Sequence, residues 1–257
     1  MKILNKVLTS LVPFQIKEYL KAEVFISKKE KQYRNLRMLF YSEFIASGDL
    51  VFDVGANLGN RTHTFLEIGA KVVSVEPQRK CRAVLRMRFG NRIKILPQGL
   101  GSKEGVKTFY ISNTHTLSTF SNKWVNKMID SGRFQNANWI KKDEIQITTL
   151  NMLISIYGKP KFIKIDVEGY ESEVLKGLDC IIDFIGFEYA VPENIDGLKE
   201  CLQKLNLIST KYVYNYAIGE SMKFVSFKWL SFSEILSHIS NSEFLETGVG
   251  DIYAKYL

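Results

Sequence analysis

Carboxylate side chains are concentrated in the segment FIKIDVEGYE, residues 162–171 of this 257-residue chain. In an extended strand alternate side chains share a face, which would place Lys164, Asp166 and Glu168 together. Carboxylates gathered at the end of a buried strand are costly unless they bind a ligand or accept a proton. We therefore expect Asp166 and Glu168 to be catalytic bases. A divalent metal is not firmly predicted; its ligands would be Asp166, Glu168 and Glu188, the last at the end of the next apolar run.

A glycine-containing turn, DVGANLG at residues 53–59, follows an apolar run. Neither the dinucleotide pattern GxGxxG nor the phosphate loop GxxxxGK[ST] is present. Instead, Asp53 precedes the first glycine by two residues, and an acid there disfavours a pyrophosphate but suits an ammonium group. S-adenosylmethionine carries an ammonium group and no phosphate. We expect Asp53 to bind that ammonium and backbone N–H groups to bind the carboxylate of the same ligand. The turn would approach the ligand closely, through Gly55, Ala56, Asn57 and Gly59.

Two later segments fit the rest of an adenosine ligand. Glu76 ends the next apolar run, 21 residues after Gly55, at the distance where an acid binds ribose hydroxyls in such folds. After the third run comes PQGLG, and we expect Gln98, Gly99 and Leu100 to line the adenine ring. Asp166 is expected to contact the cofactor as well as the acceptor.

The polar stretch 112–143 is expected to be an acceptor-side insertion, as is 215–248. It contains His115, which is a third candidate base; an exposed loop histidine without a catalytic role is the alternative. Trp124 and Trp139 lie in the same stretch and are expected to cover the acceptor.

These residues require strands that end at one edge of a sheet, with helices between the strands. The sequence predicts strands at 50–54, 71–76, 93–96, 106–112, 145–149, 162–166, 181–187, 207–213 and 250–256, and helices at 59–68, 79–89, 150–157, 171–178 and 195–205. Alternating strands and helices predict an α/β fold with a mostly parallel sheet and helices on both faces. Ligands bind such sheets beyond the carboxyl ends of the strands.

Composition and charge narrow the class of protein. The three cysteines are odd in number and widely spaced, which excludes a disulfide scaffold and fits a reducing, cytoplasmic setting. No run of about 18 apolar residues exists, so no transmembrane segment is expected. The domain is expected to span 49–257, preceded by a basic helical extension over 1–48. An apolar stripe at residues 3–11 would pack on the domain or on a second subunit of a homo-oligomer.

Three segments resemble the FkbM family of S-adenosylmethionine-dependent methyltransferases: DVGANLG at 53–59, VEP at 75–77 and IKIDVEGYESEVLKGL at 163–178. The resemblance implies a Rossmann-like class I methyltransferase fold with about seven strands, the last antiparallel. It also implies O-methylation of a hydroxyl on a sugar, polysaccharide or natural-product acceptor. One departure is Thr149-Leu150-Asn151, where the family usually has aspartate in third place; asparagine can cap a helix equally well.

Two other functions remain open from the sequence. The formal net charge is +8, and seven basic residues without an acid lie between Pro77 and Ser102. With Lys164, Asp166 and Glu188, this run would suit an RNA ribose 2′-O-methyltransferase, although nucleic acid is the less favoured partner because no RNA-binding module is attached. A catalytically silent adenosine-binding protein is the third alternative.

Overall fold

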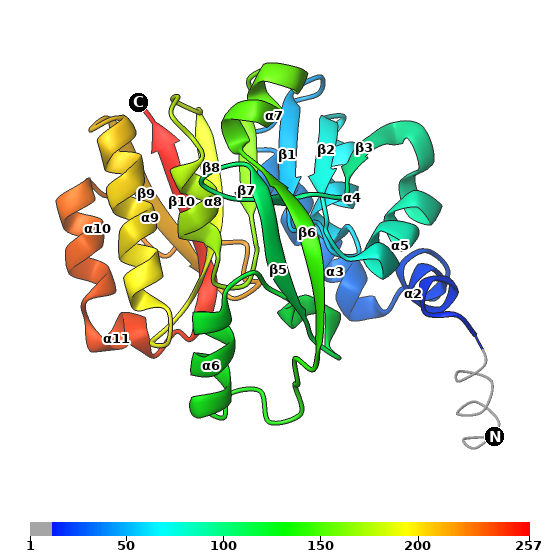
Figure 1. Cartoon of the computed structure of the whole chain (residues 1–257). Helices are drawn as coiled ribbons and strands as arrows, with labels where there is room; N and C mark the ends of the chain where they lie inside the picture. The colour runs from blue at the N-terminus through cyan, green and yellow to red at the C-terminus, as the bar shows by residue number, and fades with distance from the viewer. Residues whose placement is uncertain (1–11) are drawn as a thin grey trace.

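The computed structural model describes residues 12–257, and a seven-stranded sheet forms its centre (Figure 1). The strand order is β3-β2-β1-β7-β8-β10-β9. β10 runs antiparallel to both of its neighbours, and the other pairs run parallel. This confirms the predicted Rossmann-like α/β fold. The strands are β1 (Leu50–Val54), β2 (Lys71–Val75), β3 (Ile93–Leu96), β7 (Phe162–Ile165), β8 (Phe184–Ala190), β9 (Tyr212–Ile218) and β10 (Val249–Tyr256).

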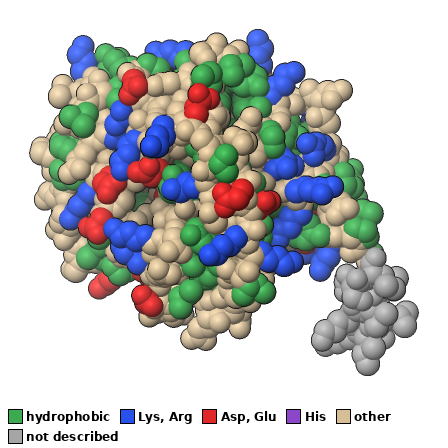
Figure 2. Space-filling view, viewed as in Figure 1, with side chains coloured by type: hydrophobic (Ala, Val, Ile, Leu, Met, Phe, Trp, Pro, Cys, Tyr) green, Lys and Arg blue, Asp and Glu red, His purple; other side chains and the backbone are tan. Residues whose placement is uncertain are grey.

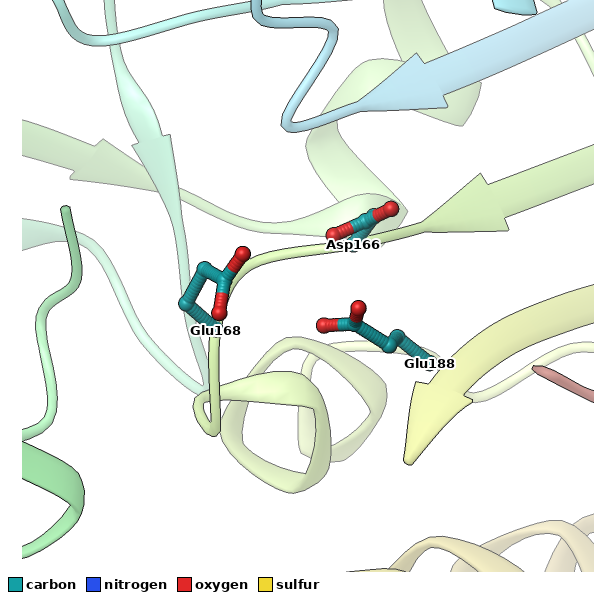
Figure 3. Close-up of side chains that lie close together, drawn as sticks. All are labelled: Asp166, Glu168 and Glu188. Atoms are coloured by element: carbon teal, nitrogen blue, oxygen red, sulfur yellow. The ribbon is translucent and has the colours of Figure 1, made fainter. Parts of the chain in front are cut away.

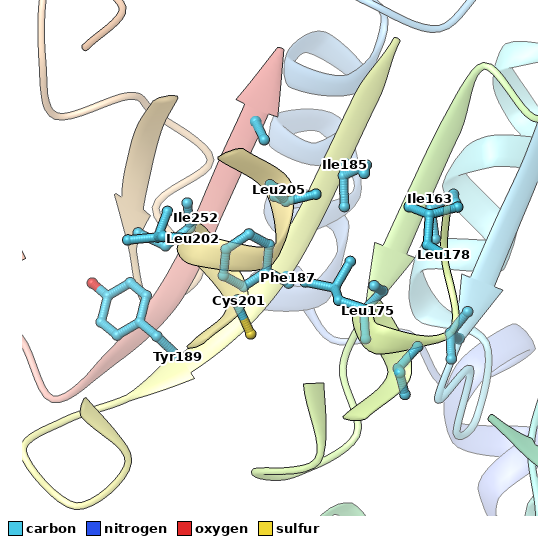
Figure 4. Close-up of a cluster of buried hydrophobic side chains, with 14 of the residues drawn as sticks. Ile163, Leu175, Leu178, Ile185, Phe187, Tyr189, Cys201, Leu202, Leu205 and Ile252 are labelled. Atoms are coloured by element: carbon cyan, nitrogen blue, oxygen red, sulfur yellow. The ribbon is translucent and has the colours of Figure 1, made fainter. Parts of the chain in front are cut away.

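Helices cover both faces of this sheet, and each face has its own hydrophobic cluster. One face packs against α3 (Lys28–Tyr41), α4 (Asn60–Ile68) and α5 (Arg79–Phe89). The other packs against α7 (Leu150–Tyr157), α8 (Glu171–Lys176), α9 (Ile195–Ile208), α10 (Phe232–Ile239) and α11 (Ser242–Leu245). Figure 4 shows side chains of α9 beside those of β8 and β10. Each fully buried Leu, Ile or Phe contributes roughly 1.5–3 kcal/mol.

The central strands are apolar because a parallel sheet is covered on both faces. β1 reads LVFDV and β7 reads FIKI. Their polar exceptions, Asp53 and Lys164, are register partners in adjacent strands, and both are buried. The two residues that break the apolar pattern therefore lie side by side near the carboxyl ends of the strands.

A second sheet lies in front of the central strands of the first in Figure 1. It has the order β4-β6-β5, with β4 (Gly99–Leu100), β5 (Gly105–Ile111) and β6 (Lys141–Thr148). The prediction started β6 four residues late, at Ile145, because the preceding KKDE is exposed and lacks an alternating pattern. Between β5 and β6 lie η2 (His115–Leu117) and α6 (Asn122–Asp130).

Two predicted strands were displaced along the chain. β8 begins at Phe184 rather than at 181, and β9 begins at Tyr212 rather than at 207. Leu207 and Ile208 continue α9, since a short apolar run fits a helix end as well as a strand. Ile182 lies in a loop. Its N–H donates to the Tyr212 hydroxyl at 2.9 Å, and that hydroxyl donates to the Ile182 carbonyl at 2.8 Å.

Two helices of the described residues precede the sheet. α2 (Phe14–Glu23) packs against α5, and α3 packs against α4. The apolar stripe at 3–11 lies outside the described residues. Cys81, Cys180 and Cys201 are all free thiols. No helix within residues 12–257 combines the length and the hydropathy that crossing a membrane requires.

Candidate functional site

A cavity of about 250 Å³ opens where the strand order reverses, at the carboxyl ends of β1, β2, β7 and β8. Nine residues predicted from the sequence line it: Gly55, Asn57, Glu76, Gly99, Leu100, His115, Asp166, Glu168 and Glu188. A smaller cavity of about 190 Å³ shares Gly55, Asn57 and Asp166 with it and adds Asp53 and Ala56. We call them the main cavity and the small cavity. The structure thus brings most of the predicted site together.

Two predicted cofactor residues line neither cavity. Gly59 precedes α4 with φ +83°, and a Cβ there would lie 2.5 Å from the Phe89 ring, so its role is in packing. Gln98 precedes β4, and its buried Oε1 has no hydrogen-bond partner among residues 12–257. Of the three residues expected to line the adenine ring, only Gly99 and Leu100 line the main cavity.

The turn after β1 requires glycine at its first position. Gly55 has φ +83°, and a Cβ there would lie 1.8 Å from the carbonyl oxygen of Asp166. β1 and β7 can therefore approach this closely only without a side chain. Beside the turn, Asp53 accepts a hydrogen bond from Thr62 Oγ1 at 2.5 Å. Burial raises the pKa of Asp53 to about 6.

Glu76 is held by backbone donors at the end of β2. Its two carboxylate oxygens accept the N–H of Asn57 at 2.8 Å and the N–H of Gln78 at 2.6 Å. Burial raises the pKa of Glu76 to about 7, although these two bonds favour the ionised form. The carboxylate is fixed in orientation at the cavity wall, as a group that binds two ribose hydroxyls must be.

The loop from 112 to 120 closes over the cavity through the carbonyl oxygen of His115. That oxygen accepts hydrogen bonds from Asn57 Nδ2 at 3.2 Å and Gln78 Nε2 at 2.8 Å. Ser118 Oγ donates to Gln78 Oε1 at 3.2 Å. Gln78 was not predicted; its position directly after the VEP segment was the signal available. The His115 ring packs edge-on against Phe14 of α2, and burial and the Lys80 charge lower its pKa.

The aromatic residues of the cavity differ from those predicted. Trp124 and Trp139 are 2% and 9% exposed and pack against each other in a separate small core. They therefore cannot stack on an acceptor. Phe109 and Phe120 line the cavity instead, with ring centroids 4.6 Å apart. The prediction failed because tryptophan in a polar stretch was assigned to the surface.

Asp166, Glu168 and Glu188 each place a carboxylate oxygen within 4.8 Å of the others (Figure 3). We call these three residues the acidic cluster. β7 ends at Ile165, so strand alternation does not explain Glu168, which has φ +56°. That conformation is uncommon for a residue with a side chain. Glu171 stabilises it, because its carboxylate accepts the N–H of Val167 at 3.0 Å and of Gly169 at 3.2 Å.

The acidic cluster is electrostatically unfavourable when every group is ionised. Partial burial and the charge of Asp166 raise the pKa of Glu168 and of Glu188 well above the usual range. One cation lies nearby: Lys164 Nζ is 2.9 Å from Asp251 and 3.5 Å from Asp166. Burial alone would lower the pKa of Lys164, but these two acids outweigh it and raise the pKa. Such a cluster can accept a proton or hold a hard divalent cation.

Asn151 lies outside this site. The cap of α7 is Thr149, whose side chain accepts the N–H of Met152, so the expected capping role of Asn151 is wrong. Asn151 instead pairs with Asp179 through two hydrogen bonds of 2.7 and 3.0 Å.

Several solved structures resemble this chain at 10–13% sequence identity. A precorrin-6y C5,15-methyltransferase from Geobacter metallireducens matches at 10% identity with TM-score 0.43, covering 91% of this chain and 92% of that one. A putative O-methyltransferase from Klebsiella pneumoniae matches at 10% identity with TM-score 0.44, covering 98% of this chain and 94% of that one. An O-methyltransferase from Bacillus cereus in complex with SAH matches at 13% identity with TM-score 0.42, covering 100% of this chain and 98% of that one.

No curated protein matches the sequence. The family model described as the methyltransferase FkbM domain matches residues 53–245. That span includes the glycine turn, Glu76 and the acidic cluster. The cavity fits the cofactor of such enzymes, since it combines a close-approach turn, a fixed carboxylate and an apolar wall at Leu100. The chain belongs to the FkbM family of S-adenosylmethionine-dependent methyltransferases.

Proposed function

We propose that this methyltransferase acts on a hydroxyl group of a sugar, polysaccharide or natural-product acceptor. The observation that carries the proposal is the acidic cluster, which lines the same cavity as the glycine turn and Glu76. A hydroxyl is a weak nucleophile unless a base accepts its proton as the new bond forms. Carboxylates in this position supply such a base.

When bound, S-adenosylmethionine supplies a methyl group activated by positive charge on sulfur. The chain's own residues then have two tasks, which are to orient the acceptor hydroxyl and to take its proton. Glu168 and Asp166 are the proposed bases. The raised pKa of Glu168 makes its ionised form a stronger base than an ordinary carboxylate. Lys164 holds Asp166 in place and remains charged itself.

The remaining predicted residues form the cofactor side. Glu76 binds the ribose hydroxyls, and Gly99 and Leu100 line the adenine. Asn57 and Gln78 keep the loop at His115 closed over the ligand. This arrangement separates cofactor binding at β1 and β2 from proton transfer at β7 and β8.

The charge distribution supports a neutral acceptor over RNA. The cavity is lined by the carboxylates Glu76, Asp166, Glu168 and Glu188, which repel phosphates. Within the basic run, Arg82 donates to the carbonyls of Glu76 and Pro77, and Arg88 pairs with Glu23 at 2.7 Å. Neither guanidinium is free to track a backbone. Figure 2 shows Lys and Arg interspersed with Asp and Glu on the viewed face.

The test is transfer of a labelled methyl group from S-adenosylmethionine into an extract of the source cells. The extract is separated into glycan, lipid and RNA fractions, with and without a chelator, and Glu168→Gln serves as the matched inactive variant. Label in the glycan or lipid fraction, absent with the variant, supports the proposal. Label confined to RNA overturns it, as does absence of label while the cofactor still binds. If the chelator abolished the transfer of label, methyl transfer would depend on a metal ion, and the acidic cluster would be its binding site.

A further inference from the structure

Arg61, the second residue of α4, lines the small cavity with a side chain that is 13% exposed. Its Nη1 and Nη2 donate to the two carboxylate oxygens of Glu220 at 2.9 and 2.7 Å. Its Nε is buried and has no hydrogen-bond partner among the described residues. A guanidinium in this position, next to the glycine turn, has no role in the functions assigned so far.

Arg61 is the cation of the small cavity that a ligand can reach. The other cation lining it, Lys164, is fully buried and paired with Asp251. The partner of Arg61 is more accessible, because Glu220 lies in the loop after β9 and its side chain is 48% exposed. A second carboxylate that replaced Glu220 would restore both hydrogen bonds to the guanidinium, so the exchange would leave no charge unpaired on Arg61.

The cofactor has a carboxylate that matches this guanidinium. Its methionine moiety carries an α-carboxylate and an α-ammonium, and arginine binds carboxylates through two parallel hydrogen bonds. The N–H groups at the start of α4 also favour a negative charge there. Asp53 and Asp166 line the same small cavity and suit the ammonium. The cavity therefore has complementary charges for both ends of an amino acid.

We propose that Arg61 binds the α-carboxylate of the methionine moiety, and that Glu220 occupies this guanidinium until the cofactor replaces it. The small cavity shares Gly55, Asn57 and Asp166 with the main cavity, so one ligand can extend through both. The displaced Glu220 has a second cation available, since Arg37 of α3 lies 3.8 Å from it. The inference rests on the cofactor in the proposed function and is independent of the acceptor.

Binding of two ligands tests this, measured by titration calorimetry. S-adenosylhomocysteine has the amino-acid end, whereas 5′-methylthioadenosine lacks it and keeps the adenosine. Arg61→Ala is expected to lower the affinity for S-adenosylhomocysteine by about tenfold or more, the usual loss for a charged hydrogen bond. It is expected to change the affinity for 5′-methylthioadenosine less than twofold. Glu220→Gln is expected to leave the affinity for S-adenosylhomocysteine unchanged or to raise it. Arg86→Ala, an exposed arginine of α5 outside both cavities, is the matched control.

The outcomes separate the roles. Equal weakening of both ligands by Arg61→Ala would show that Arg61 only supports the fold, and no weakening of either would remove it from the site; both overturn the proposal. Weakening of S-adenosylhomocysteine by Glu220→Gln to the same degree as by Arg61→Ala would overturn the displacement. If the wild-type protein bound neither ligand, the cofactor site itself would be wrong. A wrong acceptor class would leave all these affinities unchanged.

Discussion

The cofactor side and the acceptor side of the cavity use the same residue type in opposite ways. At the end of β2, Glu76 accepts two backbone N–H bonds, and at the end of β1 Asp53 accepts a hydroxyl. At the ends of β7 and β8, no hydrogen bond within residues 12–257 reaches the carboxylate of Glu168 or Glu188. The carboxylates of Glu76 and Asp53 are therefore fixed by the protein, whereas those of Glu168 and Glu188 keep their acceptor positions open to a ligand.

In the proposed function, this difference separates cofactor binding from proton transfer. A carboxylate already satisfied by the backbone is pre-organised, so it can bind ribose hydroxyls without rearrangement. Carboxylates that repel one another gain stability when a proton or cation arrives, and this is the property of a base. In the proposed function, the turn at Glu168 with φ +56° lies on the acceptor side, where its backbone strain orients the proposed base.

Glu168→Gln is expected to have the largest effect on this comparison. The amide cannot accept the hydroxyl proton, so turnover should fall about 10²–10⁴-fold, the usual contribution of a positioned base. Cofactor affinity should change less than threefold, because Glu168 lies on the acceptor side. Methyl-transfer kinetics and calorimetry on the same preparation check both values. Asp166→Asn should also lower turnover, and because Asp166 lines the small cavity as well it should weaken cofactor binding too. Loss of cofactor binding in Glu168→Gln would contradict the separation.

Glu76→Ala should produce the reverse pattern. Removing the carboxylate that receives the N–H groups of Asn57 and Gln78 eliminates the ribose acceptor, with an expected loss of about 10–100-fold in cofactor affinity. Asp53→Ala should also weaken cofactor binding. Turnover at saturating cofactor should fall much less. Equilibrium binding of S-adenosylhomocysteine measures the first effect, and near-normal affinity in both variants would refute the site assignment.

Sequence patterns located four strands of the main sheet to within one residue at each end. β1, β2, β3 and β7 follow from short, mainly apolar runs that stop at a glycine, proline or acidic residue. β8 is also mostly buried, but its start was placed three residues early. β9 was misplaced because Leu207 and Ile208 satisfy a helix and a strand equally. The β5–β6 ribbon lacked a clear pattern because one of its faces is in water, so charged residues replace apolar ones.

The pH dependence of cofactor binding should identify Glu76 as a titrating group on the cofactor side. Burial raises the pKa of Glu76 to about 7, so the carboxyl is partly protonated at neutral pH. Ribose hydroxyl donors bind the ionised form more strongly, and binding therefore releases a proton. Affinity should rise several-fold as pH increases from 6 to 8 and then level off. 5′-Methylthioadenosine isolates this effect, since it lacks the ammonium that faces Asp53. Glu76→Gln should show no such rise, and an identical slope would exclude Glu76 as the titrating group.

The residues that line the two cavities were predictable only where they lie at the end of a strand. Asp53, Glu76 and Asp166 could be found because each follows or ends an apolar run. Arg61 and Glu220 could not, because they lie 159 positions apart and only the fold pairs them. Of the three residues predicted after β3, Gly99 and Leu100 line the main cavity and Gln98 does not, because a strand-end rule selects a loop without telling which of its residues face the cavity.

The smallest effect is expected at His115, which lines both the main cavity and the small cavity. The structure uses its carbonyl oxygen, which binds Asn57 and Gln78, and leaves its ring against Phe14. His115→Ala keeps the carbonyl, so turnover should fall less than about threefold, whereas a true base would cost at least about 10². Gln78→Ala removes the donor at 2.8 Å and should loosen the loop, weakening cofactor binding about three- to tenfold. Stopped-flow measurement of cofactor release would reveal this as a faster off-rate. If His115→Ala instead lowered turnover by two orders of magnitude with cofactor affinity intact, the ring would be the base and the acidic cluster would need another role.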